Sequence, residues 1–430
     1  MSKKRTPYNR KARHPTGQTL TQERPTGIIL RPVLNTGYSN GGASAEKQAM
    51  RGYWPIRSSP KSDVDVNLNI LRNRSADMAI NSPVGAAAIN RYRTHVVGAG
   101  LVPSPCPDYR LLGMSPEEAA EWRRHTKAEF NLWAQSLECD LYRKHNFYDM
   151  QDIAFISSIV DGDAWAAIKY RKALGDNPYT TKIQLFEASR VCNPNTYSLI
   201  GALNEVEVRN PKNGNRIING VEINTDGAVV AYWVADRVPY DPTENRNIKW
   251  VRVEAFGRKT GAPNILQISH EERPEQYRGV PILAPAIEEL KQMHRYSTAE
   301  LTAAIIKSYF TLFFKTKDAG EGLPNALPEA FGENEKVAFD QYTFELGAGT
   351  MNELPPGYEV QTVDANRSLS TFEAFVNALI AQVGAALEIP SEVLLSRFQS
   401  SYSAARGALL QFQAVAKKRR IWFARDFCQP

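Results

Sequence analysis

The sequence predicts an α+β protein with several domains, and three of its features support this prediction. Between residues 151 and 270, short runs of β-type residues alternate with turn residues. Before and after this region, apolar residues recur at the spacing of amphipathic helices. A chain of 430 residues, of which 43% are hydrophobic, is long enough for about two to four domains with their own cores.

The first 25 residues form a basic arm. They contain seven lysines and arginines against one acid, so they account for the whole net charge of +6. The arm has no apolar periodicity, and we therefore expect residues 1–45 to be a disordered arm and linker. Such an arm can reach phosphate or an acidic protein surface, and it can equally be a solubilising tail.

Helices are predicted on both sides of residue 100. One helical region runs to about residue 95, and another helix begins at Ser115, where Pro116 and Glu118 complete a capping box. Apolar residues at helical spacing in this second helix are expected to be core. These residues are Trp122, Phe130, Trp133 and Leu137.

Six β-type segments follow in the middle of the chain. They are residues 182–187, 205–209, 220–224, 228–235, 249–256 and 264–270. Asp226 and Gly227 lie between the third and fourth segments and are a hairpin signal. Because turns and not helices connect the strands, we expect an antiparallel arrangement and not a βαβ nucleotide-binding sheet.

Two long helices are expected around an acidic insert. The first covers residues 281–312, and the second covers 366–390 with a capping box at Ser370–Glu373. Residues 315–364 carry ten acids and three lysines and are rich in proline and glycine, so we expect a small inserted module over 313–365. The expected stripes are Leu283, Ile287, Leu290, Leu301, Ala304 and Ile305 in the first helix, and Phe372, Phe375, Val376, Leu379, Val383 and Leu387 in the second.

A polar loop is expected over residues 391–403, before a last helix over 404–430. Its candidate contact residues are Arg397, Gln399, Ser400, Ser401 and Tyr402. One cation with several hydroxyl and amide donors suits phosphate oxygens without recognising a base sequence. The alternative is a loop that only caps the next helix.

The last helix carries four consecutive bases, Lys417, Lys418, Arg419 and Arg420. Consecutive residues point in all directions around a helix, so the four cannot form a single DNA-binding stripe. We expect them to meet an acidic face of a neighbouring subunit, or solvent.

The sequence has no motif for catalysis or for a cofactor. It contains no P-loop, and its six histidines and four cysteines lack metal-ligand spacing. Asp161 and Asp163 could hold Mg²⁺ for a nuclease, but such a pair is more typical of a turn before a strand. No apolar stretch has the roughly 20 residues of a membrane span. We therefore expect no enzyme, no cofactor, no metal and no membrane association.

Six stretches of the sequence resemble the portal proteins of lambda-type tailed bacteriophages, in that family's order. They are MAINSPVGAAAINRYRTHVVGAGLVPSP (78–105), FISSIVDGDAW (155–165), INGVEINTDGAVVAYWV (218–234), ERPEQYRGVPILAPAIEELKQMHRYSTAEL (272–301), LPPGYEV (354–360) and IPSEVLLSRFQSSYSAARGALL (389–410). No single stretch is decisive, but the ordered set is specific and covers most of residues 65–430.

The resemblance implies a ring, usually of about twelve subunits, at one capsid vertex, with a channel for double-stranded DNA. The implied partners are the large terminase subunit, a head-tail adaptor, and the major capsid or scaffolding protein. The implied location is the virion, and the host cytoplasm during assembly.

The resemblance also implies a multi-domain portal fold. Its parts on this sequence are a helical wing with an antiparallel β region (46–280), a two-helix stem (281–312 and 366–390), a small α/β clip (313–365), a tunnel loop facing the channel (391–403) and a returning wing helix (404–430). In this fold the acids Glu329, Glu333, Glu335, Asp340, Glu345 and Glu353 are candidates for docking partners at the clip. Such portals usually continue further, so the C-terminal crown is expected to be absent or truncated.

Two alternatives stay open at this stage. One is a DNA-processing enzyme, a nuclease or translocase, which an ATP- or Mg²⁺-dependent cleavage assay would reveal. The other is a head-tail adaptor or minor capsid protein, which differs from a portal mainly in size and stoichiometry.

Overall fold

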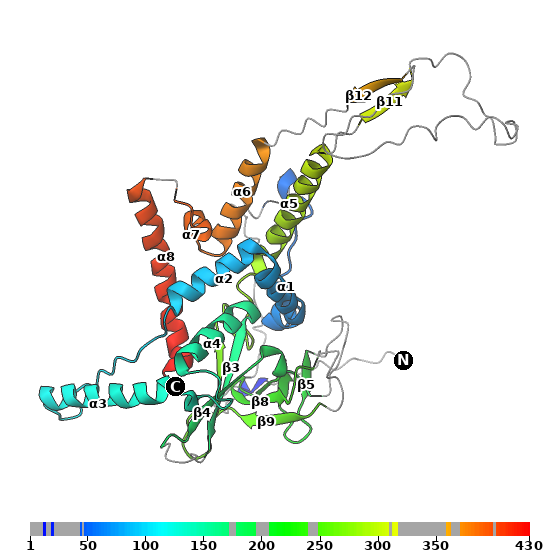
Figure 1. Ribbon diagram of the computed structural model, residues 1–430. Helices are drawn as coiled ribbons and strands as arrows, with labels where there is room; N and C mark the ends of the chain where they lie inside the picture. Colours follow the sequence, from blue (N-terminus) through cyan, green and yellow to red (C-terminus); the bar gives the residue numbers. More distant parts are fainter. Residues whose placement is uncertain are drawn as a thin grey trace, which may run out of the picture. The chain divides into compact units, whose positions relative to one another are not determined.

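The computed structural model describes residue 44 and residues 47–171, 178–194, 206–239, 248–308, 370–398 and 401–430 (Figure 1). It also describes the backbone of the short antiparallel pair β1 (Ala12–Arg13) and β2 (Thr19–Leu20), and of a second pair introduced below. The chain divides into two compact units. The sheet unit comprises Met1–Leu68, Ser189–Ile265 and Glu271–Arg278, and the helical unit comprises Asn69–Ala188, Leu266–His270 and Gly279–Pro430.

The sheet unit contains an antiparallel sheet with the strand order β5-β6-β7-β8-β9 among its described residues. The strands are β5 (Glu207–Arg209), β6 (Arg216–Ile218), β7 (Val221–Ile223), β8 (Val229–Ala235) and β9 (Trp250–Glu254). Gly227, with φ of 85°, turns β7 into β8, so the hairpin predicted at Asp226-Gly227 is confirmed. Asn219 and Gly220 both have positive φ and make the tight turn between β6 and β7.

A buried carboxylate organises one face of this sheet. Glu222 on β7 is fully buried and accepts hydrogen bonds from Arg252 Nε at 2.7 Å and Trp233 Nε1 at 2.9 Å. Asn213 and Asn215 donate to it at 2.7 and 2.9 Å. Burial alone would raise the pKa of Glu222, but these donors together outweigh burial and lower the pKa to about 2. The carboxylate is therefore a structural anion of the sheet.

The helical unit is built from helices and a small antiparallel sheet of order β10-β3-β4. Its main helices are α1 (Leu68–Asn81), α2 (Pro83–Val96), α3 (Pro116–Gln135), α4 (Phe147–Asp161), α5 (Ile287–Ser308), α6 (Ser370–Ala386), α7 (Ser391–Leu395) and α8 (Tyr402–Phe423). Its strands are β3 (Asp163–Tyr170), β4 (Thr181–Phe186) and β10 (Ile265–Ser269). One π-helical turn, Ala424–Cys428, extends α8.

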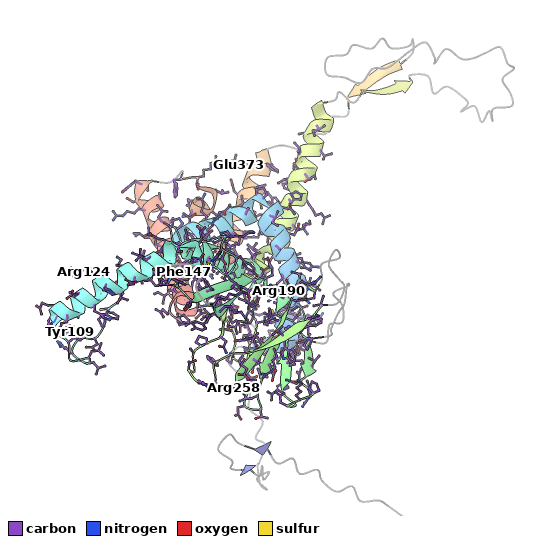
Figure 2. The ribbon with its side chains drawn as sticks, turned by 60° about the horizontal axis from the view of Figure 1, so that its bottom comes forward. Tyr109, Arg124, Phe147, Arg190, Arg258 and Glu373 are labelled. Carbon is purple, nitrogen blue, oxygen red and sulfur yellow. The ribbon has the colours of Figure 1, made fainter. Side chains whose placement is uncertain are left out.

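Aromatic side chains join the last helix to the core of the helical unit. Phe423 packs edge-on against Phe155 of α4, and Phe427 stacks on Phe147 with ring centroids 5.5 Å apart. Trp422 Nε1 donates a 2.8 Å hydrogen bond to the carbonyl of Ser269 on β10. Figure 2 shows Phe147 inside this unit, whereas Arg124 and Tyr109 lie out along α3 and the turn before it.

The pair Asp161 and Asp163 forms a turn before a strand, as the sequence indicates. Gly162, with φ of 89°, ends α4 in the left-handed region, where glycine is favoured. Asp163 is fully buried and accepts from Arg72 Nη2 at 2.8 Å and from Trp165 Nε1 at 3.2 Å. A buried carboxylate neutralised in this way stabilises the junction of α1, α4 and β3 and is not free to hold Mg²⁺.

Helices α5 and α6 lie side by side (Figure 1). Tyr296 of α5 stacks on Phe372 of α6 with ring centroids 5.4 Å apart, and Phe375 meets the Tyr296 ring edge-on. Beyond the helices, β11 (Leu312–Thr316) pairs antiparallel with β12 (Tyr358–Thr362). The two ends of the acidic insert are therefore held together by a backbone ladder.

Three sequence expectations on the fold need correction. The β-type segments form two sheets in two units, because β4 and β10 pair with β3, a strand of the region that follows α4. The capping box at Ser115 is confirmed, but Trp122 and Leu137 are exposed, whereas Phe130, Trp133 and the small Ala134 pack into the core. Leu301, Ile305 and Phe375 are also exposed, because α5 and α6 extend beyond the core that covers their other halves.

Candidate nucleic-acid and partner interfaces

The polar loop is shorter than the sequence predicts. Helix α7 occupies Ser391–Leu395, and α8 begins at Tyr402, so residues 396–401 connect the two helices. Pro390 before the helix and Glu392 in its first turn both favour a helix start, which the sequence interpretation overlooked. Ser396 then ends α7 with φ of 54°, in the left-handed region that a serine seldom adopts.

Arg91 on α2 supports this unusual turn. Its Nη2 donates a hydrogen bond to Ser396 Oγ, and α2 and α7 lie side by side (Figure 1). Arg397 follows at once, and its backbone N–H closes onto the carbonyl of Glu392 at 3.1 Å. The start of the connection is therefore anchored to α2, whose residues lie about 300 positions earlier in the sequence.

The cation of the connection has an acidic partner on α6. Arg397 Nη1 lies 3.4 Å from Glu373 Oε1, and both side chains are more than half exposed. Figure 2 marks Glu373 near the start of α6. An exposed ion pair of this kind is worth about 0 to 1 kcal/mol. This pair by itself therefore contributes little to stability.

The end of the connection caps the next helix. Ser401 Oγ accepts a hydrogen bond from the backbone N–H of Ala404 at 3.4 Å, which is an N-cap interaction. Tyr402 directly after it is 81% exposed. Gln399 and Ser400 lie outside the described residues. The capping alternative therefore holds for Ser401, while the side chains of Arg397 and Tyr402 are exposed.

The four bases of α8 divide into two pairs. Lys417 and Lys418 are exposed. Arg420 donates to the carbonyls of His95 and Val96, at 2.6 and 2.9 Å, and so occupies the C-terminus of α2, where a positive charge is favourable. Arg420 is still exposed to solvent, so the expectation of a partner or solvent is not contradicted, but the contact with α2 adds an anchoring role within the same chain.

Arg419 also turns toward its own chain. Its guanidinium lies 4.8 Å from the ring centroid of Tyr92 on α2, and its Nη2 lies 3.4 Å from Glu388 Oε2. Tyr92 is buried and donates its hydroxyl to the carbonyl of Leu387. Burial raises the pKa of Tyr92 to about 12, although Arg419 acts in the opposite direction, so the phenol stays neutral. Arg419 thus packs α8 onto α2, and the sequence interpretation missed this role.

The acidic residues that are candidates for docking a partner at the clip lie outside the described residues. These are Glu329, Glu333, Glu335, Asp340, Glu345 and Glu353. What the structure describes of this region is the β11-β12 ladder at its base.

Comparison with known proteins gives the family. The description "Phage portal protein, lambda family" matches residues 46–420. The chain belongs to this family. It is 24% identical to the portal protein of Escherichia phage N15 over 411 residues, which cover 91% of this chain and 73% of the relative. It is likewise 24% identical to portal protein B of Escherichia phage lambda, over 90% of this chain and 72% of the relative.

Solved structures of lower similarity also align with this portal-family chain. One is titled "Virion of native gene transfer agent (GTA) particle", with 14% identity, a TM-score of 0.46, and coverage of 84% of this chain and 81% of the other. A second is titled "Neck of native GTA particle computed with C12 symmetry", with 13% identity, the same TM-score, and coverage of 83% and 81%.

The described part of this portal-family chain contains no group of three or more His, Cys, Asp or Glu side chains placed to hold a metal ion. Burial raises the pKa of the Cys139 and Cys428 thiols to about 12, which makes both poor nucleophiles. None of the described helices has the length and apolar character of a membrane span.

Sequence reasoning missed the exposed face of α8. The buried face of this helix runs through Phe412, Ala416 and Phe423, so Arg406 and Leu410 lie toward solvent. Sorting the residues of the last helix by helical position would have separated these two faces.

We expect the Arg419→Ala substitution to destabilise the helical unit by about 1 to 2 kcal/mol. It removes the cation over Tyr92 and the partner of Glu388. The midpoint of urea unfolding, followed by the intrinsic fluorescence of the tryptophans, measures the loss. Lys417→Ala removes an equal charge from an exposed site and should stay within about 0.5 kcal/mol of the parent. Equal midpoints for both variants would contradict the packing role of Arg419.

Proposed function

We propose that this chain is the subunit of a closed ring at one vertex of a phage capsid, and that double-stranded DNA passes through the ring during packaging and ejection. Membership of the portal family supports the proposal. The ring would dock the large terminase subunit and later a head-tail adaptor, while its outer surface would meet the major capsid or scaffolding protein. The protein would then reside in the virion, after assembly in the host cytoplasm.

The observation that carries the proposal is the uncovered apolar surface of three helices. Leu301 and Ile305 on α5, Phe375 on α6, and Leu410 and Ile421 on α8 are all between 48% and 63% exposed. Isolated exposed apolar side chains are ordinary. Several of them along helices that extend beyond the core indicate an interface with another protein subunit. A closed ring needs two different faces on each subunit, and these helices can supply them.

We assign partner docking to the acidic insert between β11 and β12. Residues 315–364 carry ten acids and three lysines, so the insert repels DNA and attracts basic protein surfaces. The antiparallel pairing of β11 with β12 supports this assignment, because it closes the insert into a module that can be removed as a unit. The α5-α6 pair is then the stem, and the insert is the clip.

Deletion of residues 318–353 is expected to abolish binding of the terminase motor and to leave the ring intact. The deletion removes most of the acids but keeps both strands of the ladder. A binding assay with the purified large terminase subunit checks the loss of motor binding. The native mass of the variant checks that the ring stays intact. Unchanged affinity for the motor would overturn the docking assignment.

The connection between α7 and α8 is assigned to the channel wall, where it touches the DNA backbone weakly. One loop cation per subunit lets many arginines contact phosphates in turn, yet each contact is weak enough to release as the duplex moves. The exposure of the Arg397 side chain supports this assignment, because its guanidinium lies at the surface, where a phosphate oxygen can reach it.

The Arg397→Ala/Gln399→Ala double variant is expected to form normal rings and to package or retain less DNA per head. Neither residue belongs to an apolar stripe, so folding should not change. The DNA content of purified heads measures the effect, with Lys418→Ala as a control that also loses one exposed base. Normal DNA length and retention in the double variant would mean that the connection only caps α8.

A further inference from the structure

Helix α8, which follows the proposed channel loop, carries charges of positive sign alone. Its 22 residues contain five bases and no acid. Arg419 contacts Tyr92 of α2 and Glu388, and Arg420 donates to the carbonyl of Val96 at the end of α2. The remaining bases are Arg406, Lys417 and Lys418, and all three are exposed.

Arg406 is the base of α8 nearest the loop. It lies five residues after the N-cap Ser401 and one helical turn after the exposed Tyr402. Residues four apart share a helix face, so Tyr402 and Arg406 point to the same side. Among the described residues, no hydrogen bond or ion pair involves the Arg406 side chain.

The environment of Arg406 differs from that of Arg397. Arg397 has the carboxylate of Glu373 within 3.4 Å, so part of its charge is already balanced. Helix α8 offers Arg406 no acid at any position. An exposed guanidinium without an acidic neighbour attracts a phosphate more strongly than one that must first leave a carboxylate.

We propose that Arg406 is a DNA-contacting residue of the ring and supplies a larger share of the phosphate contact than Arg397. Arg397 and Tyr402 complete the contact from the loop, and Arg91 positions the loop by holding Ser396. The inference rests on the proposed function, because it needs the α7-α8 connection to face DNA. It adds a second row of cations, one from each α8, to the single row that the loop would provide.

The test compares three charge-removing variants of the assembled ring. Arg406→Gln and Arg397→Gln each remove one candidate cation, and glutamine keeps the helix propensity of position 406. Lys418→Gln is the matched control, because Lys418 is exposed on the same helix but lies about 120° around it from Arg406. The probe is a fluorescent mixed-sequence 30-base-pair duplex (roughly 100 Å of B-form DNA), and its affinity for purified rings is measured over a series of salt concentrations.

Arg406→Gln is expected to weaken binding and to reduce the slope of log affinity against log salt by about 0.9 for each subunit whose Arg406 contacts a phosphate. Arg397→Gln should reduce the slope less, and Lys418→Gln should match the parent. Arg406→Lys keeps the charge and should restore most of the slope.

Three results would overturn the inference, and they differ in their meaning for the proposed function. If Arg406→Gln behaves like Lys418→Gln while Arg397→Gln lowers the slope, Arg406 does not touch DNA, although the channel loop does. If Arg406→Gln and Arg406→Lys both fail to assemble, Arg406 belongs to subunit packing. If the parent ring itself binds the duplex without salt dependence, the proposed DNA contact fails as a whole.

Discussion

The described part of the helical unit depends on one buried junction around Tyr92. The ring of this residue packs against Phe412 of α8 and under the guanidinium of Arg419, and its hydroxyl bonds to the carbonyl of Leu387 at the end of α6. Helix α2 therefore meets the end of α6 and α8, which lie about 300 residues later in the sequence, at one side chain. Because a buried phenol needs a hydrogen-bond partner, this contact fixes the direction of the chain as it leaves α6.

The positions of the candidate contact residues follow from this junction. Leu387 lies just before α7, and Arg91 beside Tyr92 holds Ser396 at the end of α7. Arg419 and Arg420 tie the second half of α8 to α2, which leaves the first half of α8, with Tyr402 and Arg406, exposed. The same α2 surface thus anchors the loop and orients the helix that follows it.

Local signals in the sequence predicted much of the fold. The capping box at Ser115 and the turn at Asp226-Gly227 depend on neighbouring residues alone, so the sequence shows them directly. The pairing of β10 with β3 and the burial of Asp163 against Arg72 depend on residues far apart in the chain. Exposure is equally non-local, which is why Trp122 and Leu301 resemble core residues in the sequence but are exposed in the structure. For the candidate site, Arg397 and Tyr402 were predicted, whereas the separation of Lys417 and Lys418 from Arg419 and Arg420 needed the structure.

We propose that the subunit closes into a ring through apolar faces that one copy leaves exposed. The native mass of the purified protein at micromolar concentration and moderate salt measures this closure. We expect a single species whose mass is a fixed multiple of the 48.1 kDa chain and which persists as salt is raised, because apolar contacts are not screened. A monodisperse monomer under these conditions would contradict it.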